Sequence, residues 1–202
     1  MADDFLKQGR AVIEEEIAAL QSACSRLDKN FDKAARLVKS CRGRVIITGL
    51  GKSGHVGAKI AATMSSLGIP AVFMHSAEAL HGDSGMVLKG DVIIAISNSG
   101  STREVVLAAE RCKAIGAMVI AMTGNARSAL SSAADVTLDI SVAREADHLN
   151  LAPTSSTIVT MAIGDALAVA VSKDKGFKSE DFAFNHLSGA LGKKAASKQK
   201  KA

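Results

Sequence analysis

Two glycine- and serine-rich loops are the segments of this chain best suited to chemistry. One is Gly49–Gly54 (GLGKSG) and the other is Ser97–Thr102 (SNSGST), and each follows a run of β-branched apolar residues and precedes a helical pattern. At such a junction, backbone N–H groups and hydroxyls face the carboxyl edge of a parallel sheet, where helix N-termini favour anions. The pair of loops predicts a site that binds a phosphate group and leaves the rest of the ligand available for reaction.

The first loop resembles two nucleotide-binding motifs but satisfies neither. Its GxGxxG spacing matches the dinucleotide fingerprint, which requires an acidic residue at the end of the next strand. That strand ends at His75-Ser76, and Glu78 follows only beyond it. A Walker A loop requires a glycine where this chain has Ile46. We therefore expect no cofactor.

The second loop has an alternative structural explanation. Ser101 and Glu104 have the spacing of a helix capping box, in which a serine and a glutamate satisfy the first N–H groups of a helix. Capping explains one serine and one glutamate, but it leaves the other hydroxyls of the loop without a role. We therefore favour phosphate binding by the following polar residues: Ser97, Asn98, Ser99 and Thr102.

The elements that must position these loops follow from apolar periodicity. Residues 3–40 have the three- and four-residue spacing of helices, with a break near 28–30. Strands are expected at 44–48, 71–75, 91–96, 117–123 and 136–142. Helices are expected at 55–67, 102–115, 126–133 and 155–173. Residues 76–88 are expected to form a loop, and 182–191 a loop with a short helical turn. The alternation predicts a doubly wound α/β fold, with a five-stranded parallel sheet and helices on both faces.

The expected helix at 155–173 is apolar on nearly all sides. One face of a sheet cannot cover such a helix, so the sequence predicts either a subunit interface or a fully buried central helix. Subunit contacts there favour a dimer of dimers.

Composition limits the remaining possibilities. The chain has 202 residues, of which 48% are hydrophobic and 3% aromatic, and its formal net charge is +5. The last ten residues hold five lysines and no acid, so the rest carries 20 basic and 20 acidic side chains. A neutral body poor in aromatic residues does not favour nucleic-acid binding, and no uninterrupted apolar run has the length of a membrane span. Three widely spaced cysteines fit a reducing cytoplasm. We expect one domain over residues 1–192 and a disordered lysine-rich tail over 193–202.

The motifs together resemble the sugar isomerase (SIS) domain family. The resemblance rests on Gly49–His55, Ala79–Asp83, Ile96–Gly100 and Leu151–Thr157. Further matches at Gly164–Ala168, Asp181–Ala183, His186 and Gly189–Gly192 are similar to the D-arabinose-5-phosphate isomerases of that family. Those enzymes commonly carry a C-terminal pair of cystathionine-β-synthase-type regulatory modules, which we do not expect here because the chain stops at the lysine tail. The family's usual His-Pro-Gly-Gly is His-Leu-Ser-Gly from His186, and the middle of 145–153 also differs.

The resemblance implies an aldose–ketose isomerase that interconverts D-ribulose 5-phosphate and D-arabinose 5-phosphate through an enediol. The reaction requires acid/base groups and a cation or hydrogen-bond donor near the enediolate oxygen. The residues that match the family's active-site positions are Lys52, His81, Glu104, Glu145 and His186. The phosphate is expected on Ser53 and the polar residues of the second loop. The product would supply the Kdo sugar of bacterial surface polysaccharides.

Three alternatives accompany this interpretation. Asp83 is suited to orienting His81 or to sharing a metal with it, but two ligands are too few for a metal site, and we expect no metal. The substrate of the isomerase is open to a different phosphosugar. A non-catalytic SIS module that senses a sugar phosphate is the rival function, although the chain shows no DNA-binding domain that such a sensor would require.

Overall fold

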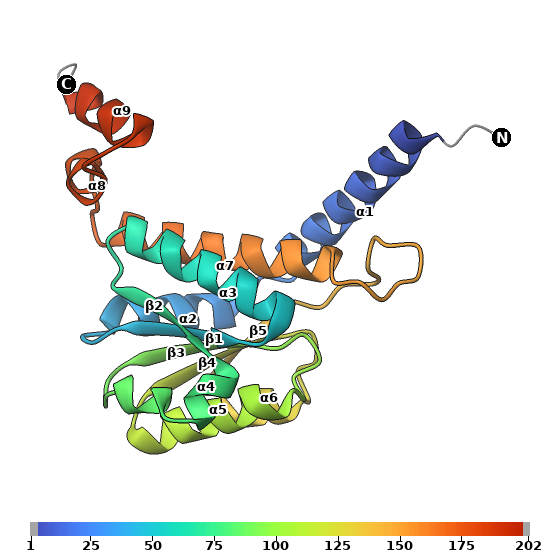
Figure 1. Ribbon diagram of the computed structural model, residues 1–202, viewed down its shortest axis with the longest axis horizontal. Coiled ribbons are helices and arrows are strands. Elements are labelled where there is room, and N and C mark those ends of the chain that lie inside the picture. The colour runs from blue at the N-terminus through green and yellow to red at the C-terminus, as the bar shows by residue number, and fades with distance from the viewer. Residues whose placement is uncertain (1–3, 200–202) are drawn as a thin grey trace.

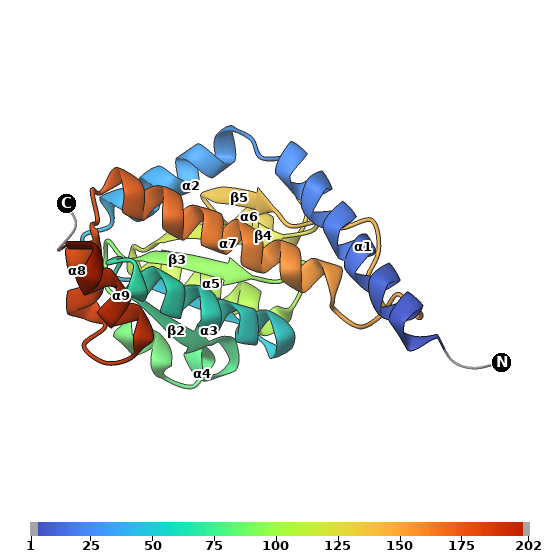
Figure 2. The same ribbon diagram turned by 90° about the horizontal axis from the view of Figure 1, so that it is seen from above.

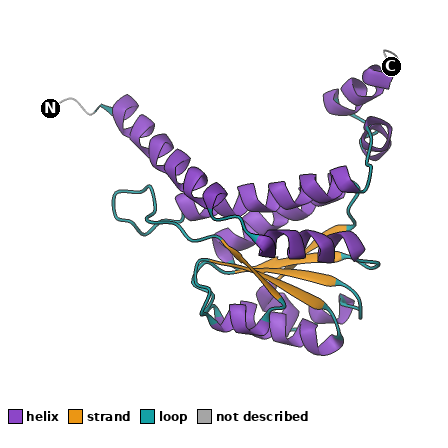
Figure 3. Ribbon diagram, turned by 180° about the vertical axis from the view of Figure 1, so that it is seen from behind, coloured by secondary structure: helices purple, strands orange, loops and turns teal. Residues whose placement is uncertain are grey.

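The computed structural model describes residues 4–199 and contains a five-stranded sheet (Figures 1 and 3). All neighbouring strands are parallel, in the order β2-β1-β3-β4-β5. Their bounds are β1 Val45–Gly49, β2 Ala71–His75, β3 Val92–Ile96, β4 Met118–Thr123 and β5 Val136–Asp139. Strands β1 and β3 are buried throughout, as continuous apolar runs covered on both faces should be. The predicted doubly wound α/β fold is confirmed.

Helices cover the two faces of the sheet in separate layers. The described helices are α1 Phe5–Ser25, α2 Lys29–Ser40, α3 Gly51–Ser66, α4 Ser76–Leu80, the 3-10 helix η1 Asp83–Met86, α5 Arg103–Ile115, α6 Ala129–Ala133, α7 Ser155–Asp174, α8 Ser179–Asn185 and α9 Ala190–Gln199. Helices α1, α2, α3 and α7 lie on one side of the sheet, and α4, α5 and α6 on the other (Figure 1). Successive strand residues face opposite sides, so Ile47 joins the first core and Ile46 the second.

Helix α7 is the centre of the first layer. By length and composition it could cross a membrane, yet half of its residues are buried inside the fold, where it packs against α1, α2 and α3. Within α7, all of which is described, Val169 is the large apolar side chain that is mostly exposed. The fold thus covers part of the apolar surface of α7 within one chain, and the predicted subunit contact at α7 stays a prediction.

Several predicted boundaries differ from the observed ones. Helix α3 begins at Gly51 rather than at residue 55, which places the glycine-rich loop within the first turns of the helix. The predicted loop 76–88 contains α4 and η1. Strand β5 ends at Asp139 rather than at residue 142.

The C-terminal segment forms two short helices, α8 and α9, which pack on each other. Residues 193–199, predicted as part of a disordered tail, continue α9, because alanine and lysine have high helix propensities. Residues 200–202 of that predicted tail lie outside the described residues.

Two helical segments extend away from the body of the molecule. The N-terminal part of α1 projects at one end, and α8 and α9 project at the other (Figures 1 and 2). Both carry exposed large apolar side chains, among them Phe5 and Ile13 on α1 and Phe184, Leu187 and Leu191 in the C-terminal segment. Exposed apolar groups gathered on projecting elements are typical of surfaces that another chain covers.

Candidate active site

The candidate site lies at the carboxyl edge of the sheet, where β1 and β3 end side by side. Gly49 pairs with Ile96 at the last register position of the two strands. From this point α3 crosses to one face of the sheet and α5 to the other. Parallel α/β sheets bind ligands in the crevice that such a divergence opens.

A cavity of about 300 Å³ occupies this crevice. Its polar lining consists of the five predicted phosphate-binding residues: Ser53, Ser97, Asn98, Ser99 and Thr102. The remaining lining residues are Leu50, Gly51, Ile96 and Val105, which the motif argument did not single out. Two loops separated by more than forty residues thus contribute hydroxyl and amide groups to one small cavity.

The loop after β3 is held in one shape by its own hydroxyls. Ser97 Oγ shares a 2.9 Å hydrogen bond with Thr102 Oγ1 and accepts one of 3.2 Å from the N–H of Gly100. Gly100 has a φ of 65°, and a Cβ there would lie 2.1 Å from Ser128 Oγ and 2.6 Å from Thr123 Oγ1. The turn therefore requires glycine for both conformation and space.

Both helices that begin at the cavity lack a side-chain cap. Leu50 is the N-cap of α3 and Thr102 that of α5, and neither side chain accepts a hydrogen bond from its helix. The capping box offered as the alternative explanation of this loop does not form. The N-cap of α5 is Thr102 rather than Ser101, and Ser101 Oγ donates to Ser99 Oγ at 3.1 Å. Uncapped N–H groups of two helix N-termini facing one cavity favour an anion there.

Lys52 and Glu104 occupy the first turns of these two helices. Lys52 is exposed on α3, and Glu104 is half-buried on α5. Among the described residues, neither side chain has a hydrogen-bond or ion-pair partner. A cation and a carboxylate without internal partners are therefore held on the elements that flank the cavity.

His81 follows α4 at the same edge of the sheet as the cavity, because α4 starts where β2 ends. Its side chain is exposed, and no hydrogen bond to Asp83 is present among residues 4–199. Within the same described range, no group of three or more His, Cys, Asp or Glu side chains is arranged to hold a metal ion. The predicted orienting role of Asp83 is not part of this geometry.

Glu145 lies in the segment between β5 and α7 and caps α7. One carboxylate oxygen, Oε2, accepts hydrogen bonds from the backbone N–H of Thr154 at 2.8 Å and of Ser156 at 3.1 Å. The Thr154 hydroxyl adds a third at 3.3 Å. The other oxygen, Oε1, accepts no hydrogen bond from the described residues. Glu145 is 9% exposed. Its carboxylate is thus fixed in orientation, with one oxygen left for another partner.

The segment that carries Glu145 is itself held by hydrogen bonds. Asp147 accepts the backbone N–H groups of Leu149, Leu151 and Ala152, each at 2.8 Å. Desolvation opposes ionisation of Asp147, but these bonds together outweigh it and lower the pKa of its carboxyl below the ordinary value. Asn150, with a φ of 55°, uses its side-chain oxygen to accept the N–H of Glu145 at 2.7 Å.

His186 lies apart from the cavity within its own chain. At the end of α7, Ser172 Oγ donates to the carbonyl of Leu67, and the Phe177 ring lies against Gly68. Leu67 and Gly68 come just before β2, so the chain leaves α7 near the start of that strand. This is the amino edge of the sheet, and α8 and α9 follow there (Figure 2). The His186 ring stacks on Phe182 with centroids 3.9 Å apart. The structure brings the other nine predicted site residues to the carboxyl edge or to helices beginning there, but not His186.

The chain matches the family model of the SIS domain over residues 39–170 and belongs to this family. It is 52% identical to arabinose 5-phosphate isomerase KdsD of Pseudomonas aeruginosa, over 95% of this chain and 59% of the relative. It is 46% identical to arabinose 5-phosphate isomerase GutQ of Escherichia coli K12, over 98% of this chain and 62% of the relative. The chain thus spans less than two thirds of the length of these relatives.

A solved structure shares both the fold and much of the sequence. It is that of an Escherichia coli CFT073 protein in complex with arabinose 5-phosphate, which is similar with a TM-score of 0.88 and 38% identity. The similarity covers 92% of this chain and 99% of that one. The predicted SIS fold and family membership are therefore confirmed.

Proposed function

We propose that the protein is an aldose–ketose isomerase that interconverts D-ribulose 5-phosphate and D-arabinose 5-phosphate. The cavity between β1 and β3 carries this proposal, because it combines four hydroxyls, one amide and two uncapped helix N-termini in about 300 Å³. That set suits a phosphate monoester at the end of a small sugar. The arabinose 5-phosphate isomerases among the relatives support this choice of sugar.

The reaction moves a proton between C1 and C2 of the sugar through an enediol. With the phosphate at the cavity, the sugar carbons extend toward the side chains at the helix starts around it. Lys52 is suited to stabilising the enediolate oxygen, because it is a cation without an internal partner. Glu104, Glu145 and His81 supply acid/base groups for the carbon-bound and hydroxyl protons. The free Oε1 of Glu145 is the atom that can accept a proton, since Oε2 is occupied by three donors.

We propose that His186 completes the site of a second copy. Its position at the amino edge of the sheet separates it from the cavity of its own chain, whereas a neighbouring chain can present it from outside. The exposed Phe184 and Leu187 flank it, and they supply apolar surface for such a contact. We propose a homotetramer, arranged as a dimer of dimers, in which the projecting α1, α8 and α9 add contact surface to that of α7.

Complementation between inactive variants tests the shared site. Lys52→Ala and His186→Ala proteins, each inactive alone, should regain part of the activity when mixed and reassembled, because some sites then receive both wild-type residues. Mixing each variant with itself is the control. A mixture that forms mixed oligomers yet stays inactive would contradict sharing, and a monodisperse active monomer by light scattering would contradict assembly.

The proposed setting is the bacterial cytoplasm, where the product would feed synthesis of the Kdo sugar. The three free thiols, Cys24, Cys41 and Cys112, are compatible with a reducing compartment. The family resemblance, rather than any feature of the site, supports the pathway.

A substrate panel separates the proposed enzyme from its rivals. Purified protein incubated with pentose and hexose phosphates and followed by NMR should convert ribulose 5-phosphate to arabinose 5-phosphate. Preferential conversion of another sugar phosphate would replace the substrate while keeping the reaction. Binding of a sugar phosphate without any conversion by folded, assembled protein would favour the non-catalytic sensor.

A further inference from the structure

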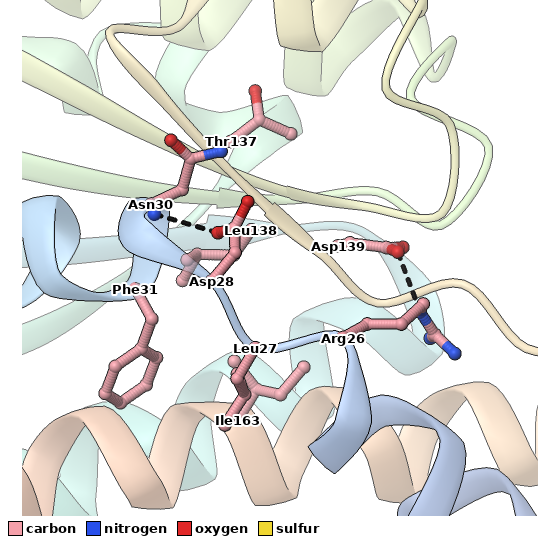
Figure 4. A pocket seen from close by; sticks show the side chains of 9 residues that line it. All are labelled: Arg26, Leu27, Asp28, Asn30, Phe31, Thr137, Leu138, Asp139 and Ile163. Carbon is pink, nitrogen blue, oxygen red and sulfur yellow. Dashed lines mark hydrogen bonds and ion pairs between the residues drawn. The ribbon is translucent and has the colours of Figure 1, made fainter.

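Arg26 lies directly after α1 and joins segments that are far apart in the chain. Its Nε donates to Asp139 Oδ2 at 2.8 Å, across 113 residues of sequence. Its two terminal nitrogens donate to the carbonyl of Ser141 and to Ser22 Oγ. Figure 4 shows the pair of Arg26 and Asp139 at the rim of a cavity of about 320 Å³ beside β5.

These contacts fix the point where the chain leaves β5. Asp139 is the last residue of the strand, and its second oxygen, Oδ1, accepts the N–H of Ser141 at 2.8 Å. The N–H of Ser141 is therefore held by Asp139, while its carbonyl is held by Arg26. A planar guanidinium with several donors can hold a carboxylate and a carbonyl at once, which a lysine cannot do with the same geometry.

Ser141, which these contacts hold, begins the segment that carries Glu145, and Glu145 lies four positions further on. The other end of that segment is anchored at Thr154 and Ser156 through Glu145 itself. Between these anchors lie exposed residues such as Leu149 and Leu151. The Ser141 anchor fixes where the segment leaves the sheet, and the contacts at Thr154 and Ser156 fix the carboxylate of Glu145.

The ion pair is poorly placed to act mainly on stability. The side chains of Arg26 and Asp139 are 31% and 44% exposed, and partly exposed ion pairs contribute little to folding. The same contacts can affect the rate strongly through the position of Glu145, because a misplacement of about 1 Å at a reacting group costs up to about 100-fold in rate.

We propose that Arg26 is a positioning residue for Glu145. Arg26 also connects the C-terminal end of α1 to Ser141, at the start of the segment that carries Glu145. The placement of α1, whose N-terminal part projects from the body, is thereby linked to the site. The proposal rests on the proposed isomerase function, in which Glu145 is an acid/base group.

The test compares Arg26→Gln with Arg36→Gln, which removes an exposed guanidinium of α2 that has no described partner. Arg26→Gln should lower kcat by about 10- to 100-fold and leave KM for the sugar phosphate within about two-fold, because Arg26 does not line the phosphate cavity. Arg26→Lys should lie between the two. Asp139→Asn should reduce kcat similarly and add little to Arg26→Gln, since both changes break the contact between Arg26 and Asp139. Hydrogen exchange should become faster at residues 141–146 in Arg26→Gln but not in Arg36→Gln.

Equal kcat for Arg26→Gln and Arg36→Gln, with wild type active, would overturn the proposal. So would unchanged hydrogen exchange at residues 141–146. If Arg26→Gln does not fold, the same two readouts on Arg26→Lys decide. An inactive wild type would instead contradict the proposed function, and the exchange measurement would still show whether Arg26 fixes the segment.

Discussion

Substitution of Glu145 separates its role as a helix cap from its proposed role in catalysis. Glu145→Ala removes the acceptor of the backbone N–H groups of Thr154, the N-cap of α7, and of Ser156, and of the Thr154 hydroxyl. Loss of an N-cap costs about 0.5–2 kcal/mol, and a donor left buried without a partner costs about 1–3 kcal/mol. Both figures describe the loss of the same acceptor and are not added, so we expect a loss of about 1–3 kcal/mol. At about 2–4 °C per kcal/mol for a chain of this size, the Tm should fall by roughly 2–12 °C.

Glu145→Gln keeps one acceptor oxygen for these donors, but it loses the charge and replaces the other oxygen with an NH₂ group. Its interaction with the helix N-terminus weakens by about 0.3–1 kcal/mol, so the Tm should change by no more than roughly 4 °C. If the free oxygen accepts a proton in the reaction, kcat should nevertheless fall by about 10²–10⁴-fold.

Thermal unfolding and steady-state isomerisation, measured on both variants at a temperature where both are folded, provide the test. A Glu145→Gln protein with wild-type kcat would refute the acid/base role and leave Glu145 as a cap alone. A Glu145→Ala protein with unchanged Tm would refute the energetic argument for the cap.

Four further outcomes are expected. Ser97→Ala or Ser99→Ala should raise KM more than it lowers kcat, because phosphate contacts act in ground and transition states alike; an unchanged KM by initial-rate kinetics would contradict this. Gly100→Ala should lower the Tm and weaken phosphate binding, since its Cβ would meet Ser128; denaturation with and without phosphate tests both effects. EDTA should leave the rate unchanged, and restoration of a lost rate by one metal would contradict us. Acidification should loosen residues 147–152. The pKa of Asp147 lies below its unfolded value, so its stabilisation of the segment is present above about pH 4 and is lost as the pH falls through the folded value. Unchanged protection of these amides from hydrogen exchange in acid would contradict this prediction.

The sheet and the phosphate cavity could be predicted because each depends on local sequence. The β-branched runs before Gly49 and Ser97 define buried strands, and parallel topology then brings both loops to one edge. The sequence predicts the start of α3 at residue 55 because Gly51 and Gly54 suggest a loop. In the structure Gly51, with a φ of 58°, is the first residue of the helix.

Contacts between distant segments could not be predicted. Glu145 reaches the N-terminus of α7 across nine residues with no periodic pattern, and Arg26 reaches Asp139 across 113. Neither contact has a sequence signal, since a lone charged residue in a loop or after a helix is most often solvated. By contrast, the position of His186 is implied by the sequence, because a helix as long as α7 carries the chain from one edge of the sheet to the other before it turns.

The most direct test of the account is isomerisation of ribulose 5-phosphate in D₂O, followed by NMR. An enediol mechanism passes the proton through a side chain that exchanges with solvent. We expect arabinose 5-phosphate to form, with deuterium at C2 in at least part of the product, and Lys52→Ala and Glu145→Gln to suppress both conversion and labelling. Conversion with no deuterium at C2 would contradict the enediol route, and no conversion by folded, assembled wild-type protein would contradict the proposed function.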